Sequence, residues 1–206
     1  MLLGHSVQGR PIRAVELGDP GAQRKVLVVG CVHGNETAGI TVAHAVDRAK
    51  PRRLDVWVVN DLNPDGVAVH TRQNAHGVDL NRNFPWRWRP LGRRGDQQYS
   101  GQVPLSEPES RIAHSLILRL RPAVAVWFHQ PLGLVDESGG DVAVERRFSR
   151  LTGLPLRRLA RYPGSAVGWE NHLVPGGTAF VAELPARPVT PRQADRYAHA
   201  ILRVGI

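Results

Sequence analysis

The sequence predicts an α/β sandwich in which helices cover both faces of a sheet. Five short runs of β-branched or aliphatic residues are predicted to be strands, because such residues fit a buried, pleated surface. Several of these runs are apolar at every position, which is typical of strands that are covered on both sides. Segments with helical patterns fall between them, and this alternation favours a sheet flanked by helices.

The elements are expected in a simple order along the chain. The strands are predicted at residues 12–17 (IRAVEL), 25–30 (KVLVVG), 54–60 (LDVWVVN), 123–129 (AVAVWFH) and 178–184 (TAFVAEL). The helices are predicted at 36–49, 107–120, 142–152 and 191–203. No internal repeat or low-complexity segment interrupts this order, and 206 residues suit one domain. Residues 1–206 are therefore expected to form a single domain.

The composition is that of a soluble globular protein, with 42% hydrophobic and 22% charged residues. No apolar run approaches the length of a membrane span, so no membrane association is expected. The apolar start is too short for a signal-peptide core, which predicts a cytoplasmic protein, or a secreted one if a leader has been removed. Cys31 is the only cysteine, which excludes an internal disulfide.

The net charge of +9 raises the question of a nucleic-acid partner. The excess is almost entirely arginine, scattered along the chain, and no zinc-finger, helix-turn-helix or aromatic RNA-binding motif is present. We therefore expect no nucleic acid. An anionic small substrate or a cell-wall polymer is compatible with this charge, and the oligomeric state is left open.

The region 61–106 is rich in Asn, Asp, Gly, Pro and Arg and shows no convincing periodicity. A structureless stretch of this length inside a compact domain usually carries function. In open α/β sheets, ligands bind at the carboxyl ends of strands. His33, the start of this loop and His129 all lie at such ends, so these three elements are predicted to meet at a site.

The stretch GCVHGNETAG places His33 three residues ahead of Glu36. A polar turn before a helix is one interpretation, with Glu36 in the first helical turn. A metal site is the other, and it requires a third ligand. His129 closes an apolar strand and is the favoured candidate. Two histidines and one carboxylate leave a coordination position open to water, which is typical of a catalytic zinc site.

Several motifs together resemble the zinc carboxypeptidase family of the carboxypeptidase A type. They are the His33–Glu36 pair, His129, NPDG at 63–66, GVDLNRNFP at 77–85 and FVAELP at 180–185. Three further stretches are most similar to the bacterial murein peptide amidase branch, namely SVQGRPI (6–12), HQPLGLVD (129–136) and YPGSAVGW (162–169). This resemblance implies a three-layer sandwich with a mostly parallel mixed sheet. It also implies cleavage of the γ-D-glutamyl–diaminopimelate bond of murein peptides.

The resemblance also implies roles for individual residues. His33, Glu36 and His129 would bind one zinc ion per chain, and Glu183 would take a proton from the attacking water. Arg72 would polarise the scissile carbonyl and stabilise the oxyanion. The alternatives are a capping or salt-bridging role for Glu183 and a solvated loop position for Arg72.

The resemblance implies that two further residues bind the substrate and that a third orients a zinc-binding histidine. Asn81 and Arg82 match the pair that holds the terminal carboxylate of the substrate. Asp79 resembles the carboxylate that orients a zinc-binding histidine, with an Asx turn as an equally good interpretation.

Two aromatic features remain. The mobile tyrosine of the family would fall near Asn171, two residues after Trp169, so the sequence predicts that this phenol is absent. The segment PWRWRP (85–90) could wall a substrate pocket with its two tryptophans. Aromatic packing and cation–π stacking that pin a loop are the favoured interpretation of this segment.

Three classes of function remain open. The favoured one is a zinc metallopeptidase that hydrolyses an amide bond in short, carboxylate-rich peptides. A zinc deacylase of N-acyl amino acids, of the aspartoacylase and succinylglutamate desuccinylase type, shares the HGNE start and the Asp-Leu-Asn-Arg segment. NPDG and GVDLNRNFP together favour the peptidase. A catalytically dead binding module is the third class, but every expected ligand and the base are present.

Overall fold

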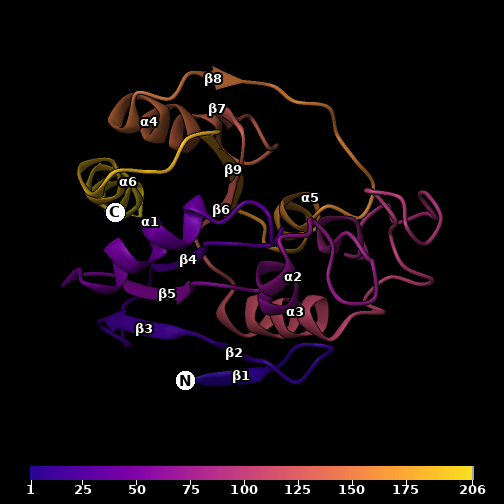
Figure 1. Ribbon diagram of the computed structural model, residues 1–206. Helices are drawn as coiled ribbons and strands as arrows, with labels where there is room; N and C mark the ends of the chain where they lie inside the picture. Colours follow the sequence, from indigo (N-terminus) through magenta and orange to yellow (C-terminus); the bar gives the residue numbers. More distant parts are fainter. Residues whose placement is uncertain (206) are drawn as a thin grey trace.

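The computed structural model describes residues 1–205, and its centre is a seven-stranded mixed sheet (Figure 1). Neighbouring strands follow the order β3-β5-β4-β6-β9-β7-β8. The four central strands are parallel to one another and are β5 (Asp55–Val59), β4 (Lys25–Val29), β6 (Val124–His129) and β9 (Thr178–Pro185). The outer strands are β3 (Val15–Gly18) and β7 (Leu132–Asp136), both antiparallel to their inner neighbours, and β8 (Leu156–Arg157). The carboxyl ends of the central strands therefore share one edge.

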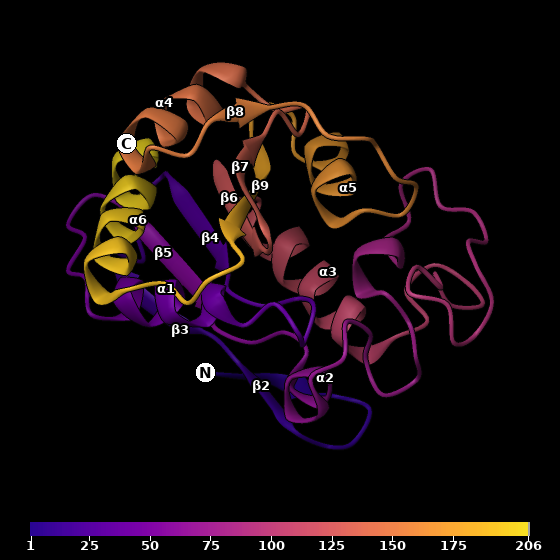
Figure 2. The ribbon, with the colours of Figure 1, turned by 45° about the horizontal axis from the view of Figure 1, so that its top comes forward.

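Helices cover both faces of the sheet and make three layers (Figures 1 and 2). One face carries α1 (Ala38–Asp47), α4 (Val142–Thr152) and α6 (Pro191–Val204), and the other carries α3 (Pro108–Leu120) and α5 (Ala166–Leu173). A hairpin of β1 (Leu2–His5) and β2 (Pro11–Arg13) packs beside α3. The prediction of an α/β sandwich with a mostly parallel mixed sheet is confirmed. Within residues 1–205, no helix combines the length and the apolarity needed to cross a membrane.

The core consists of two apolar layers, one on each face of the sheet. All six residues of β6 are buried, and they alternate between the layers. Val126 and Phe128 pack in the layer under α1, α4 and α6, while Ala125 and Trp127 pack in the layer under α3 and α5. This burial on both faces explains why the central strands are apolar at every position.

Most predicted elements are confirmed, with shifted ends. The run 12–17 is divided into β2 and β3 at Ala14, whose N–H donates to the carbonyl of Met1. The predicted helix 36–49 begins at Ala38, because Glu36 belongs to a turn in which its N–H donates to the His33 carbonyl. Strands β1, β7 and β8 and helix α5 were not predicted, since each is short or has mixed polarity.

The expectation that 61–106 is structureless was wrong. The segment contains α2 (Pro64–Val69) and a 3-10 turn (Leu80–Arg82). Both are too short to show a helical period, but both begin with a side-chain cap. Asn63 Oδ1 accepts from Gly66 N at 3.0 Å, and Asp79 Oδ1 accepts from Asn81 N at 3.0 Å.

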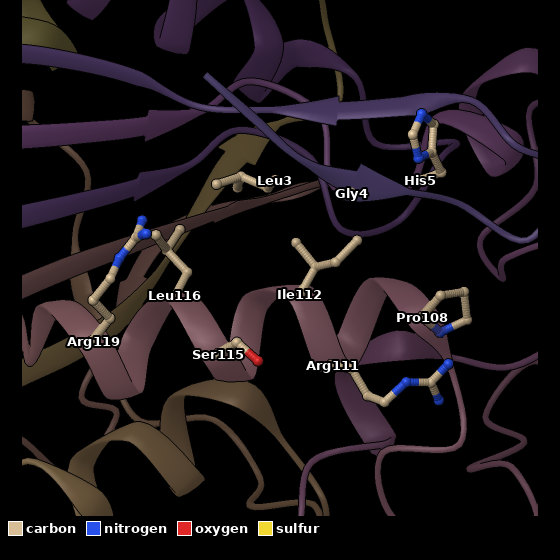
Figure 3. Close-up of a pocket in the computed structure, with 9 residues that line it drawn as sticks. All are labelled: Leu3, Gly4, His5, Pro108, Arg111, Ile112, Ser115, Leu116 and Arg119. Carbon is tan, nitrogen blue, oxygen red and sulfur yellow. The ribbon is translucent and has the colours of Figure 1, made fainter.

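A pocket of about 520 Å³ lies between β1 and α3 (Figure 3). Leu3 approaches it from the strand, and Ile112 and Leu116 approach it from the helix, with Arg111 and Arg119 also on the helix side. None of its lining residues is a predicted site residue. This pocket is therefore separate from the candidate site described below.

One acidic side chain, Glu170, lies in the core layer under α5. It is 2% exposed, and Trp127 Nε1 donates to its Oε2 at 3.0 Å. Among the described residues, no group donates a hydrogen bond to its Oε1. Burial raises the pKa of Glu170 to about 8, and the hydrogen bond from Trp127 offsets only part of this shift. The side chain is therefore mostly protonated at neutral pH.

We expect Glu170 to make the protein less stable as the pH rises. Its pKa is about 8 when folded and near its ordinary value of 4.5 when unfolded, so its stabilising contribution is complete below pH 4.5 and is lost by pH 8. Glu170→Gln should remove this dependence, which amounts to about 1.4 kcal/mol per pH unit between those values. The measurement is urea unfolding of both proteins at several pH values. Parallel stability curves for the two would contradict the assignment.

Candidate functional site

Three side chains converge at the carboxyl edge of the sheet. His33 Nδ1 lies 3.1 Å from His129 Nδ1 and 3.0 Å from Glu36 Oε2, and His129 Nδ1 lies 3.0 Å from the same oxygen. A tetrahedron around zinc with ligands at about 2.0 Å has edges of about 3.3 Å, so this triangle fits three of its corners. All three residues are buried. The donor set predicted from the sequence is thus brought together and could bind a metal ion.

Two neighbouring parallel strands place these ligands. His129 is the last residue of β6, and His33 follows β4, which pairs with β6 in parallel. The turn after His33 requires a close approach to α2, because a Cβ at Gly34 would lie 2.0 Å from the Gly66 backbone. Gly34 therefore permits the turn that carries Glu36 back toward the two histidines.

Asp79 and Arg72 hold the ligands from behind. Asp79 is fully buried, and its Oδ1 lies 3.0 Å from His33 Nε2, which keeps the proton on that nitrogen and frees Nδ1 for a metal. Arg72 Nε donates to Asp79 Oδ2 at 3.0 Å, and its Nη1 donates to Glu36 Oε1 at 3.0 Å. Burial alone would raise the pKa of Asp79, but the charges of His33 and Arg72 hold it well below its usual range.

Asp79 fits both interpretations of its position, since it contacts a histidine of the cluster and also forms the Asx turn. Its carboxylate contacts the ligand histidine and also caps the turn at Asn81. Arg72 is not a solvated loop residue, since its side chain is 23% exposed and joins two carboxylates. These contacts leave Glu36 Oε2 facing the histidines.

Glu183 lies beside His129 in the β6–β9 ladder, where the two residues are register partners. In parallel strands, partner side chains lie on the same face, so the carboxylate stands next to the ligand triangle. The one hydrogen bond to its carboxylate comes from Leu132 N at 3.4 Å within the described chain. Burial raises the pKa of Glu183, while the charge of His129 acts in the opposite direction. A carboxylate with few partners suits a proton acceptor.

Asn81 and Arg82 lie in the 3-10 turn on the other side of the triangle. Asn81 Oδ1 accepts from Ala166 N at 2.9 Å, and its Nδ2 lies 3.4 Å from His129 Nε2. Arg82 Nη1 donates to the Asn81 carbonyl at 2.8 Å, but its buried Nε has no acceptor within residues 1–205. A buried guanidinium with an unused donor fits an anion that is supplied from outside.

A phenol lies in this pocket, although Asn171, where the mobile tyrosine of the family would fall, is not a tyrosine. Tyr162 lines the same pocket, and the Arg82 guanidinium lies 4.1 Å from the centre of its ring. The neighbouring Gly164 has φ +69°, and a Cβ there would lie 2.2 Å from the Arg82 carbonyl, so the chain passes very close to the turn. Tyr162 comes from the loop before α5, and not from the position two residues after Trp169.

Seven of the eight predicted residues line one pocket of about 390 Å³, and Asp79 lies behind it. The seven are His33, Glu36, Arg72, Asn81, Arg82, His129 and Glu183. Asp136, Ser138, Arg161 and Tyr162 line the same pocket and were not predicted. Their signal in the sequence was weak, since the stretches HQPLGLVD and YPGSAVGW indicated a family branch but no role.

Other motifs support the site without lining it. Asn63 of NPDG donates from Nδ2 to the carbonyls of Val32 and Arg72, at 3.2 and 3.3 Å. It therefore fixes the backbone next to a ligand and at the arginine. Asp65 accepts from the Ser6 hydroxyl at 2.8 Å, which ties the N-terminal hairpin to α2.

The segment PWRWRP is pinned by aromatic contacts. The ring of Trp86 stacks on His172 with centroids 3.4 Å apart, and Trp88 Nε1 donates to the Ser100 carbonyl at 3.3 Å. This agrees with the favoured interpretation of a packed loop. Trp86, Arg87 and Arg89 also line a pocket of about 660 Å³. Ser138, Arg161 and Tyr162 are among the residues that line both this pocket and the pocket of about 390 Å³ that contains the predicted site residues.

Sequence comparison finds relatives with named activities. The zinc carboxypeptidase family profile matches residues 1–130. Murein peptide amidase A from Escherichia coli (strain K12) is 35% identical over 181 residues, which cover 81% of this chain and 74% of that protein. Murein peptide amidase A from Vibrio campbellii is 33% identical over 185 residues, which cover 82% and 73%.

Solved structures agree with this similarity. Murein-tripeptide amidase MpaA from Escherichia coli O157 matches with a TM-score of 0.77 at 28% identity, covering 100% of this chain and 90% of that one. Carboxypeptidase A from Helicoverpa armigera matches with a TM-score of 0.85 at 19% identity, covering 100% of this chain and 66% of that one. The second match concerns the fold alone.

Proposed function

The chain belongs to the zinc carboxypeptidase family, and from this membership we propose its substrate and the roles of its site residues. It is a zinc-dependent hydrolase that cleaves the γ-D-glutamyl–diaminopimelate amide bond of short murein peptides. The similarity to two murein peptide amidases supports this substrate class. The deacylase alternative loses support, because the relatives that match over most of this chain are named murein peptide amidases.

One zinc ion per chain would be held by His33, Glu36 and His129. The three donor atoms lie 3.0 to 3.1 Å apart, and Asp79 and Arg72 fix the outer atoms of two of these ligands. When bound, zinc supplies an electrophile for the scissile carbonyl and makes a water molecule more acidic.

The protein's own residues would carry the other steps. Glu183 accepts the proton of the attacking water and returns it to the departing nitrogen of the diaminopimelate residue. Arg72 lines the same pocket with a fixed positive charge, which stabilises negative charge on the former carbonyl oxygen. Asn81 and Arg82 hold the carboxylate next to the departing nitrogen, and the unpaired Nε of Arg82 is the donor that supports this role.

The observation that carries this proposal is the placement of Glu183 beside the ligand triangle, in the same pocket as Arg82. The test is an assay on L-Ala-γ-D-Glu-diaminopimelate and on N-acyl amino acids, with and without a chelator. Chelator-sensitive cleavage of the tripeptide alone is expected. Cleavage of the N-acyl amino acids in preference would assign the deacylase function instead.

The metal content provides a separate prediction. The purified protein should contain one zinc per chain by elemental analysis, and replacing both His33 and His129 by alanine should remove it, because one carboxylate cannot hold the ion. His44→Ala is the control, since His44 is exposed on α1 and lies outside the triangle. Stoichiometric zinc in the double variant would disprove this assignment.

A further inference from the structure

A second arginine is fixed at the wall of the substrate pocket. Arg161 lies in the segment that runs from β8 to α5 (Figure 1), and its Nη1 donates to Asp136 Oδ2 at 2.6 Å. The same carboxylate accepts from the Ser138 hydroxyl and from Leu159 N, each at 2.8 Å. Asp136 is 3% exposed, so the guanidinium of Arg161 is held by a buried carboxylate.

Asp136 lies two residues along β7 from the register partner of Glu183. In the antiparallel pairing of β7 with β9, Leu134 is the partner of Glu183 and Val135 is the partner of Ala182. Continuing this register by one residue brings Asp136 opposite Val181, and both residues line the pocket. Two residues of strand correspond to about 7 Å. Asp136 is therefore about that far from Glu183 along the strand direction, on the same face of the sheet.

Arg161 keeps donors free for a ligand. Its side chain is 41% exposed, and its Nε and Nη2 have no acceptor in the described part of the chain. It lines the pocket together with Arg82 and also borders the adjoining cavity at Trp86. The pocket thus contains two guanidinium groups with unused donors, and the one at Arg82 already has a proposed carboxylate.

From this arrangement we propose that Arg161 binds a second carboxylate, at the far end of the side chain whose α-carboxylate is held by Arg82. The inference rests on the proposed function, in which the residue after the scissile bond is diaminopimelate. That residue carries a carboxylate and an ammonium group beyond three methylene groups. Arg161 would form two parallel hydrogen bonds to the carboxylate, and Asp136 is the positioning residue that orients the guanidinium.

Lysine provides the matched substrate, because it is diaminopimelate without the distal carboxylate. The wild-type protein should cleave L-Ala-γ-D-Glu-diaminopimelate about 10- to 100-fold more efficiently, in kcat/KM, than the same peptide ending in L-lysine. Arg161→Met should remove most of this preference by lowering kcat/KM for the diaminopimelate peptide alone. Arg158→Met is the control, since Arg158 is exposed on the same segment and should keep the preference.

Several outcomes would overturn the proposal. One is a wild-type protein that cleaves both peptides equally well, a result that requires no variant to fold. Another is an equal loss on both peptides in Arg161→Met with an unchanged melting temperature, which indicates a role in loop position. A third peptide, with the α-carboxylate of D-glutamate amidated, tests the opposite side of the scissile bond. If the wild-type protein prefers the free peptide over this amidated peptide and Arg161→Met loses that preference, Arg161 binds the α-carboxylate of D-glutamate instead.

Folding and the proposed function are tested separately. Arg161→Met leaves Asp136 without its cation, so Arg161→Lys is the second variant. It keeps the ion pair but loses the forked geometry, and it should show a reduced preference with a near wild-type melting temperature. A wild-type preference in this variant would overturn the two-bond contact. If the wild-type protein cleaves neither peptide, the proposed function fails first, whereas cleavage without preference rejects only the Arg161 subsite.

Discussion

Glu183→Gln is expected to abolish measurable turnover, with kcat lower by about 10²- to 10⁴-fold or more. The reason is geometric. Glu183 is the register partner of His129, so its carboxylate stands next to the three candidate metal-binding residues and is not one of them. A fourth protein ligand would occupy the position that water needs, so the proposed function assigns this carboxylate the role of base. Glutamine keeps the shape of the side chain and removes the base.

Zinc content and substrate binding should both persist in Glu183→Gln. Glu183→Asp keeps a base but withdraws it, so its activity should be strongly reduced and not absent. Glu137→Gln is the matched control, because Glu137 lies just after β7 and does not line the pocket. Loss of zinc from Glu183→Gln, or near-normal turnover, would require a different role for this residue.

The central strands could be predicted because they are buried on both faces. Every residue of β5 and β6 is buried, and such strands leave a continuous apolar signal in the sequence. β7 has an exposed first residue and two half-buried ones, so it leaves no such signal. Its position is set by pairing with β9, a long-range contact that local pattern does not contain.

The convergence of the three candidate metal-binding residues could be predicted for a related reason. His33 and His129 follow adjacent parallel strands, and the carboxyl ends of such strands meet at one edge. The position of a ligand at a strand end is therefore readable from sequence once the strands are known. Glu36 needs only the local turn after His33.

Residues carried by loops were harder to place. Tyr162 and Arg161 come from a segment with almost no regular structure, and their positions depend on contacts with Arg82 and Asp136. Tyr162 lies before α5, and no motif spacing in the sequence indicates that it would line the pocket. The sequence also left open which residue contacts the far end of the substrate, because the network that joins Asp136 to Ser138, Leu159 and Arg161 exists only in the fold.

Arg82→Ala is expected to raise KM sharply, by an amount on the order of 2 to 5 kcal/mol in binding free energy. Arg82 is 5% exposed, and burial lowers the pKa of its guanidinium, so the group lies in a poorly solvated position. A substrate carboxylate bound there would pair with the guanidinium, so that each charge takes the place of water around the other. The contact exists before and during the reaction, so its loss should affect KM more than kcat.

Two controls test this variant, namely a modified substrate and a second arginine variant. A peptide whose terminal carboxylate next to the departing nitrogen is amidated cannot use Arg82, so Arg82→Ala should change its kcat/KM little. Arg93→Ala removes an exposed arginine from the same loop region and should leave both substrates unaffected. If Arg82 holds the substrate carboxylate, kcat/KM should fall only when the arginine is replaced and the substrate carboxylate is free. If Arg82→Ala left kcat/KM unchanged for both the free and the amidated peptide, Arg82 would not hold the substrate carboxylate, and its unpaired Nε would need another ligand.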